Sequence, residues 1–176
     1  MLAPSQKLLN TAKNRKVFVS HFLMVPTDKG VEVVEKRESE VIKTVREEVT
    51  KAIDKGEDVK DKVFTITRDA VKKALSEAEV TKERVQSASK HTMKGAIEGA
   101  QKAEGEVAEV TKWAAEGIIE GTQQAGTKAT DLLEHAAEAA LDTAKEAGDK
   151  AAELVKDVVK GVSEAVKEVL KRKEEK

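Results

Sequence analysis

Apolar residues recur with an 11-residue period along most of the chain. Counting in steps of 11 from Val41 to Val162 meets only apolar residues, and the rows that start at Ile42 and at Val45 contain no charged residue. The three rows hold 36 positions without a charge in a chain that is 37% charged, which chance does not explain. This period makes three helical turns at about 3.67 residues per turn, so the rows predict one continuous apolar stripe on an α-helix. The period is not the heptad of a left-handed coiled coil.

The polar face of the predicted helix is also ordered. Eight of the twelve residues in the row near its centre are acidic, whereas the two rows nearer the stripe hold six and seven basic residues. Lysine lays its methylene groups along an apolar surface and sends its ammonium group outward. This distribution is expected of a helix in a lipid headgroup layer. A solvated face with ion pairs between successive helical turns is the other interpretation.

These rows define two sets of candidate binding residues. The stripe predicted to face lipid or a partner comprises Val41, Ile42, Val45, Ile53, Val63, Phe64, Leu75, Val85, Ile97, Val107, Ile118, Ile119, Leu133, Leu141, Val155, Val162 and Val166. The side chains predicted to pair with lipid headgroups are Lys51, Lys62, Lys73, Arg84, Lys112, Lys128, Lys145, Lys150, Lys156 and Lys167.

The sequence predicts an all-α protein, mostly one long interrupted amphipathic helix over residues 31–172. Both prolines, Pro4 and Pro26, lie near the start, and Ala, Glu, Lys and Val dominate the remainder. Nine glycines fall inside the repeat, and each costs a helix interior about 1 kcal/mol relative to alanine. We therefore expect conditional folding, with a disordered or partly helical chain in dilute solution and a helical one on a surface or after drying.

Some of these glycines have an alternative interpretation as turns of a helical bundle. The best candidates are Asp54–Asp58 and the Gly117–Gly126 region. The pairs Gly95/Gly99 and Gly117/Gly121 have the GxxxG spacing that promotes helix docking in apolar membrane spans. Because charged residues surround both pairs, we do not expect helix docking at them.

The N-terminal segment differs in kind from the remainder, so the chain divides into residues 1–30 and 31–176. Residues 1–27 contain basic residues but no acidic one, and Val17–Val25 is the most apolar stretch of the protein. An organelle transit peptide, the apolar region of a secretory signal, and a short element packed on the remainder are all consistent with this composition. We expect a cytoplasmic or an organellar location, the latter mitochondrial or plastid.

The sequence offers no chemistry typical of an enzyme. Cysteine is absent, and His21, His91 and His135 lack ligand-like spacing, so neither catalytic nor metal-binding residues are predicted. Phosphate-binding loops and a GxSxG motif are missing as well, and we expect no cofactor and no small-molecule substrate. A net charge of -1 argues against nucleic acid as a partner. Trp113 falls on the polar face, outside the stripe.

The local sequence Thr143–Glu153, TAKEAGDKAAE, resembles the TAQAAKEKAGE-type repeat of group 3 late embryogenesis abundant proteins. The 11-residue periodicity covers residues 41–170, and the part whose sequence is similar to the family's repeat unit covers about 128–160. The resemblance implies a chain that is disordered in water, becomes helical on drying and protects membranes and proteins during desiccation, cold or osmotic stress. Apolipoproteins, synucleins and perilipins share the 11-residue geometry and coat lipid surfaces.

We therefore expect a non-enzymatic, stress-protective protein that folds into an amphipathic helix on membranes or client proteins. Its binding would be peripheral and reversible, because many shallow contacts by small side chains add up. The alternatives are a structural helical bundle or oligomer, in which the stripes bury one another, and a lipid-surface coat of the apolipoprotein or synuclein type. Self-association is compatible with each of them.

Overall fold

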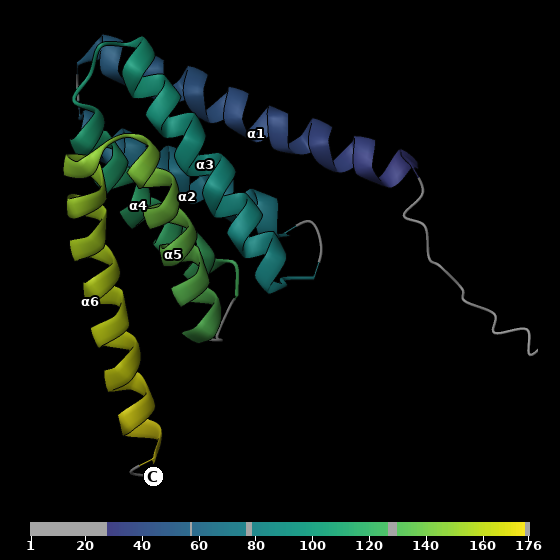
Figure 1. The fold of residues 1–176 in the computed structure, drawn as a ribbon, viewed down its shortest axis with the longest axis vertical. Helices are drawn as coiled ribbons and strands as arrows, with labels where there is room; N and C mark the ends of the chain where they lie inside the picture. The colour runs from purple at the N-terminus through teal and green to yellow at the C-terminus, as the bar shows by residue number, and fades with distance from the viewer. Residues whose placement is uncertain (1–27, 57, 77–78, 127–129, 175–176) are drawn as a thin grey trace, which may run out of the picture.

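The computed structural model describes residues 28–56, 58–76, 79–126 and 130–174, and these residues form six α-helices without a strand (Figure 1). The predicted targeting segment, residues 1–27, lies outside the described residues. The helices are α1 (Asp28–Lys55), α2 (Val59–Ser76), α3 (Lys82–Lys102), α4 (Val107–Gln124), α5 (Thr130–Glu146) and α6 (Asp149–Glu174). The all-α class is confirmed.

The chain folds back at the connections between these helices instead of running as one extended helix. The predicted turn at Asp54–Asp58 is confirmed, with left-handed backbone at Gly56 (φ +68°) and Asp58 (φ 48°). In the second predicted region the turn comes only at its end, where Gly126 has φ +85°. Glycine adopts this conformation without the steric cost that a side chain would add.

Polar side chains secure the connection between α2 and α3. The Thr81 hydroxyl accepts a hydrogen bond from the Arg84 backbone N–H at 3.4 Å and caps the N-terminus of α3. The guanidinium of Arg84 donates to the carbonyl oxygen of Ala74 at 2.7 Å, near the C-terminus of α2. A cation at this end of a helix also interacts favourably with the helix dipole. One residue therefore joins the end of α2 to the start of α3.

The helices form an open array with a regular contact pattern. Within the described residues, each helix contacts the next helix and the next but one, and the α2–α4 and α1–α3 interfaces are the largest. Figure 1 shows α1 and α6 on opposite sides of the array, each extending beyond the helix beside it. Contacts limited to near neighbours along the chain are typical of repeat proteins.

The core of the array is built from the predicted apolar stripe, from alanine and from larger residues outside the stripe rows, among them Val49, Val71 and Val110. Large buried side chains come mainly from α1 to α4 and include Val45, Val63, Leu75, Met93 and Ile118. Small residues fill the close contacts between helices, because alanine, glycine and threonine allow the backbones to approach. At the two largest interfaces, stripe residues of α1 and α2 pack on Gly95 of α3 and Gly117 of α4, which belong to a row beside the stripe.

The net charges of the helices match this packing. Counting Lys and Arg against Asp and Glu, the six helices carry net charges of -1, +3, +3, -2, -4 and +1 in chain order. Each helix therefore has the opposite sign to the next helix but one, against which it packs. Attraction between these opposite net charges favours the pairing of α1 with α3, α2 with α4, α3 with α5 and α4 with α6.

Candidate interaction surface

The predicted stripe divides into a buried and a half-buried part. The fully buried members are Val45, Val63, Leu75, Val85, Ile97, Ile118 and Val155. The half-buried members are Val41, Ile42, Ile53, Phe64, Val107, Ile119, Leu133, Leu141 and Val162. The side chain of Val166 lies outside the described residues. In the folded array the stripe is therefore mostly an internal surface, and only its edges reach solvent.

The predicted headgroup-pairing residues lie mostly at the surface. Lys51, Lys73, Lys145, Lys150 and Lys156 are exposed, and Lys62, Lys112 and Arg84 are half-buried. Lys128 and the side chain of Lys167 lie outside the described residues. Two of these cations already have protein partners, since Lys145 Nζ lies 2.7 Å from Asp142 Oδ1 and Arg84 bonds the end of α2.

Helix docking occurs at the GxxxG pair of α3, contrary to the expectation from its charged surroundings. A Cβ atom built on Gly95 would lie 2.8 Å from the carbonyl oxygen of Ile42 and 2.9 Å from Cβ of Val45. One turn later, a Cβ atom on Gly99 would lie 2.8 Å from the carbonyl oxygen of Arg46. Glycine lets the backbone of α3 rest on that of α1. The expectation was wrong because the charged side chains beside the pair leave the contact clear: Lys94 is exposed, and Glu98 pairs with Arg46 of α1.

The same docking is repeated between α4 and α2. A Cβ atom on Gly117 would collide with the carbonyl oxygen of Phe64 and the hydroxyl of Thr67, and one on Gly121 would collide with the carbonyl oxygen of Arg68. Each of these glycines stands 53 positions after the residue whose carbonyl oxygen it meets, as in the α1–α3 contact. The α2–α4 pair is thus the α1–α3 pair moved along the chain by two sequence periods.

Threonine in the stripe is compatible with burial because its hydroxyl bonds within its own helix. Thr67, Thr111, Thr122 and Thr143 each donate to the carbonyl oxygen one turn earlier, at 2.6 to 2.9 Å. A buried hydroxyl satisfied in this way leaves a small, mostly apolar surface for the neighbouring helix. Thr67, Thr111 and Thr122 of the row that starts at Val45 thereby belong to the core, as does Thr143 outside the three rows. Ser89 of the same row as Thr67 is buried without a hydrogen-bond partner for its hydroxyl among the described residues.

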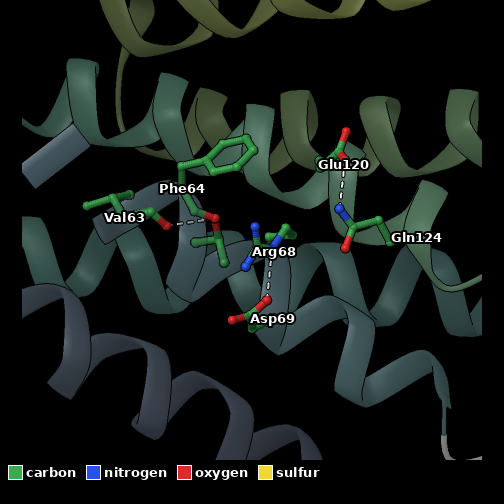
Figure 2. Close-up of polar contacts among 7 residues, drawn as sticks. Val63, Phe64, Arg68, Asp69, Glu120 and Gln124 are labelled. Carbon is green, nitrogen blue, oxygen red and sulfur yellow. Dashed lines mark hydrogen bonds and ion pairs between the residues drawn. The ribbon is translucent and has the colours of Figure 1, made fainter. Parts of the chain in front are cut away.

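A small polar cluster borders the α2–α4 docking site (Figure 2). Arg68 Nε lies 2.8 Å from Asp69 Oδ1, and its guanidinium carbon lies 5.9 Å from the centre of the Phe64 ring. The hydrogen bond to Asp69 raises the pKa of Arg68 above its ordinary value, with a further contribution from the charge of Glu120. On α4, Gln124 Nε2 donates to Glu120 Oε1 at 2.7 Å. The cluster encloses the contact with charge and hydrogen bonds at the surface.

Trp113, which departs from the stripe, makes a contact with the core of the array. It is half-buried and packs against the hydrophobic core, although the 11-residue count puts it on the polar face. The reason is the central position of α4, which contacts α2, α3, α5 and α6. A helix packed on several sides needs apolar residues outside a single stripe. Correspondingly, α4 carries only three acidic residues and one basic residue.

The described residues offer little that is typical of a catalytic or metal site. Within them, no group of three or more His, Asp or Glu side chains could hold a metal ion. A shallow open groove between α1 and α2 is lined by side chains of both signs, including Glu48, Lys51, Asp61 and Lys62. None of the described helices is long and apolar enough to cross a bilayer. The stripe and its charged borders therefore remain the main candidate for function.

Comparison of the chain with known protein families, with curated proteins and with solved structures finds no match.

Proposed function

We propose that this protein is a stress-protective surface protein that stores its apolar stripe inside the helical array and presents it to membranes or client proteins. In this proposal the helices cover one another's stripes in dilute solution, and this folded array takes the place of the disordered or partly helical chain expected from the sequence. On a lipid surface, or when water is withdrawn, helices separate and lay the same residues on the new surface. The protein acts by reversible coating and performs no chemical reaction.

The observation that carries the proposal is the unbroken phase of the 11-residue repeat across the turns. The rows from Val41 to Val162 continue through five connections without an insertion or a deletion. In water this phase spaces the docking glycines of the array 22 residues apart, and on a surface it has a second consequence. A stripe that keeps its phase through the turns stays continuous when the chain is straightened.

The connections are suited to such straightening because none contains proline. From Thr27 onward the chain has no proline, so every turn residue retains its N–H and can enter a helix. The cost of leaving the array is the loss of helix–helix contacts made largely by alanine and valine. A lipid surface offers the same side chains an apolar environment. The equilibrium between the folded array and the surface-bound helix therefore shifts toward the bound form as more lipid surface becomes available.

The resemblance to group 3 late embryogenesis abundant proteins supports a role in stress. Drying concentrates both the protein and its potential clients, and it removes the water that favours burial inside the array. In this proposal the exposed lysines that border the stripe pair with lipid phosphates, and acidic side chains keep the outer face hydrated.

A purely structural helical bundle is the second candidate function. The close glycine contacts of α3 on α1 and of α4 on α2 favour it, since they are specific to a folded array. Such a protein would keep its helix–helix contacts in the presence of lipid. The two functions therefore differ in what lipid does to the array.

Vesicle flotation of the full chain tests the proposal. A triple variant, Leu133→Ser, Leu141→Ser and Val162→Ser, removes apolar stripe residues that are only half-buried, and urea unfolding checks that the variant still folds, since Leu141 also packs against the core. The matched control, Glu138→Ser, Glu153→Ser and Glu164→Ser, alters exposed acidic positions on the same two helices. We expect the unaltered chain and the control to float with phosphatidylcholine vesicles and the stripe variant to remain in solution.

A drying assay extends this test to protein clients. A desiccation-sensitive enzyme dried with the unaltered chain should recover more activity than one dried with the stripe variant. If the unaltered chain neither floats with vesicles nor protects the enzyme, the coating function is wrong and the structural bundle is the better account.

A further inference from the structure

The last two helices are held to the array by smaller side chains than the first four. Among the described side chains of α1 to α4, ten Val, Leu, Ile and Met residues are buried. In α5 the buried residues are four alanines and a threonine, and among the described side chains of α6 only Ala151 and Val155 are buried. Because alanine removes little apolar area from water, the buried residues of α5 contribute little apolar area each to docking.

The glycine docking that joins the first four helices is not repeated at α6. The row that contains Gly95 and Gly117 continues in steps of 22 to Ala139 and Gly161. A Cβ atom on Gly161 would meet nothing within 4 Å, and Gly161 is exposed. The close backbone contacts therefore fix α3 on α1 and α4 on α2 and leave this part of α6 free.

The connection between α5 and α6 is the shortest of the array. Only Ala147 and Gly148 separate the two helices, and Gly148 has a left-handed backbone with φ +113° and open space around it. The apolar rows pass through this turn in phase, from Leu133 and Ala144 to Val155. A change of backbone at this turn would join α5 and α6 into one amphipathic helix.

Both helices also present large apolar side chains at their surface. Leu133 and Leu141 of α5 are half-buried, as are Leu154, Val158 and Val162 of α6. The last three follow one another at a spacing of four and form a ridge along α6. Leu141 and Val158 also pack against the core, so Leu133, Leu154 and Val162 are the large apolar side chains that α5 and α6 can offer to a partner without first leaving the array.

We propose that α5 and α6 leave the array first and straighten into one helix on a zwitterionic lipid layer, while α1 to α4 remain docked. This inference rests on the proposed function and names the part of the chain that begins it. Zwitterionic headgroups fit because α5 carries five acidic residues and one basic residue, which an anionic layer would repel. The phosphates remain available to the exposed Lys150 and Lys156 of α6.

Two insertions between Ala147 and Gly148 provide a test with a matched control. Each residue of an α-helix advances about 100°, so inserting Ala-Ala turns the stripe of a joined α6 by about 200°, to the opposite face. Inserting Ala-Ala-Lys-Ala turns it by about 40° and keeps the two stripes together. In the folded array both insertions only lengthen a surface turn, which costs little.

The measurement is binding of each full-length variant to phosphatidylcholine vesicles, with urea unfolding as the check on folding. We expect the Ala-Ala insertion to weaken binding by about tenfold or more, because half of the stripe faces away from lipid. The Ala-Ala-Lys-Ala insertion should stay within about threefold of the unaltered chain. Equal binding by both variants, or equal loss in both, overturns the straightened helix and leaves the coating function intact.

Binding of the unaltered chain to two kinds of vesicle distinguishes a wrong assignment of the lipid from a failure of the proposed function. If it does not bind phosphatidylcholine vesicles but binds vesicles with phosphatidylserine, the assignment to a zwitterionic layer is wrong. If it binds neither, this inference is wrong, and the proposed function fails with it when the drying assay also shows no protection.

A cross-link between α1 and α3 gives a further check on which helices must move. The side chains of Arg46 and Glu98 meet across this interface and are partly exposed, so Arg46→Cys and Glu98→Cys can be joined by a reducible thiol-reactive cross-linker. Binding to phosphatidylcholine vesicles should be unchanged after cross-linking, because α1 to α4 remain docked. Loss of binding on cross-linking, restored by reduction, would show that α1 and α3 must separate first.

Discussion

Gly95 of α3 stands so close to Ile42 of α1 that a Cβ atom on the glycine would lie 2.8 Å from the isoleucine carbonyl oxygen. The contact is between backbones, and side chains of the two helices interlock around it. Because it recurs two sequence periods later between α4 and α2, it is a property of the repeat. The period that predicts an amphipathic stripe thus also sets the places where helices dock.

Gly95→Ala is expected to destabilise the array. Alanine favours a helix by about 1 kcal/mol over glycine, but here its Cβ would push against backbone and against Val45. Overpacking of this kind typically costs about 1–3 kcal/mol. Urea unfolding should therefore show a net loss of stability. The matched control, Gly161→Ala, has open space and should gain about 0.5–1 kcal/mol. A stabilising Gly95→Ala would contradict the close docking.

The sequence predicts the content of the core better than its arrangement. Periodicity alone identifies Val45, Val63 and Ile118 as members of one apolar surface, and all three are buried. It does not reveal that this surface folds back on itself, because a continuous stripe suits an extended helix on lipid and an array in water equally. The choice depends on contacts between residues 53 positions apart, and a count along one helix does not contain them.

The candidate site could be predicted only in part for the same reason. The 11-residue rows place Arg84 among the headgroup-pairing cations, but its position at the start of α3 brings it to the carbonyl oxygen of Ala74. The same count assigns Trp113 to a polar face that α4, packed on several sides, scarcely has. For Arg84 and Trp113, contacts with other helices decide what each side chain does. The 11-residue period gives only the position of a residue around its own helix.

The cap of α3 predicts a pH effect on stability. Hydrogen bonds from the Glu83 backbone N–H and the Thr81 hydroxyl lower the pKa of Glu83 below its ordinary value of 4.5. A carboxylate whose pKa is lower in the folded chain stabilises the fold above the unfolded value, and this contribution is lost as the pH falls through the folded pKa. We expect Glu83→Gln to flatten the fall in stability below about pH 4.5. Glu79→Gln, an exposed change in the same connection, is the control.

The ion pair between Arg46 and Glu98 is expected to contribute little to stability. Arg46 Nη1 lies 3.3 Å from Glu98 Oε2 across the α1–α3 interface, with side chains 37% and 31% exposed. Partly solvated pairs of this kind usually contribute about 0.2–1 kcal/mol. A double-mutant cycle with Arg46→Ala and Glu98→Ala, followed by urea unfolding, should give a coupling energy in this range. A much larger coupling would mean that charge, and not glycine docking, holds α1 to α3.

Salt should loosen the end of the array more than its centre. The net charges of α3 and α5 are +3 and -4, and their contact is made on the α5 side by small residues. Raising ionic strength from about 0.1 M to about 1 M shortens the Debye length from about 10 Å to about 3 Å and weakens this attraction. Hydrogen exchange followed by mass spectrometry should then show faster exchange in α5 and α6, while the helices docked through glycine change less. Uniform acceleration along all six helices would mean that the array opens as one cooperative unit, and the charges would then support the whole fold equally.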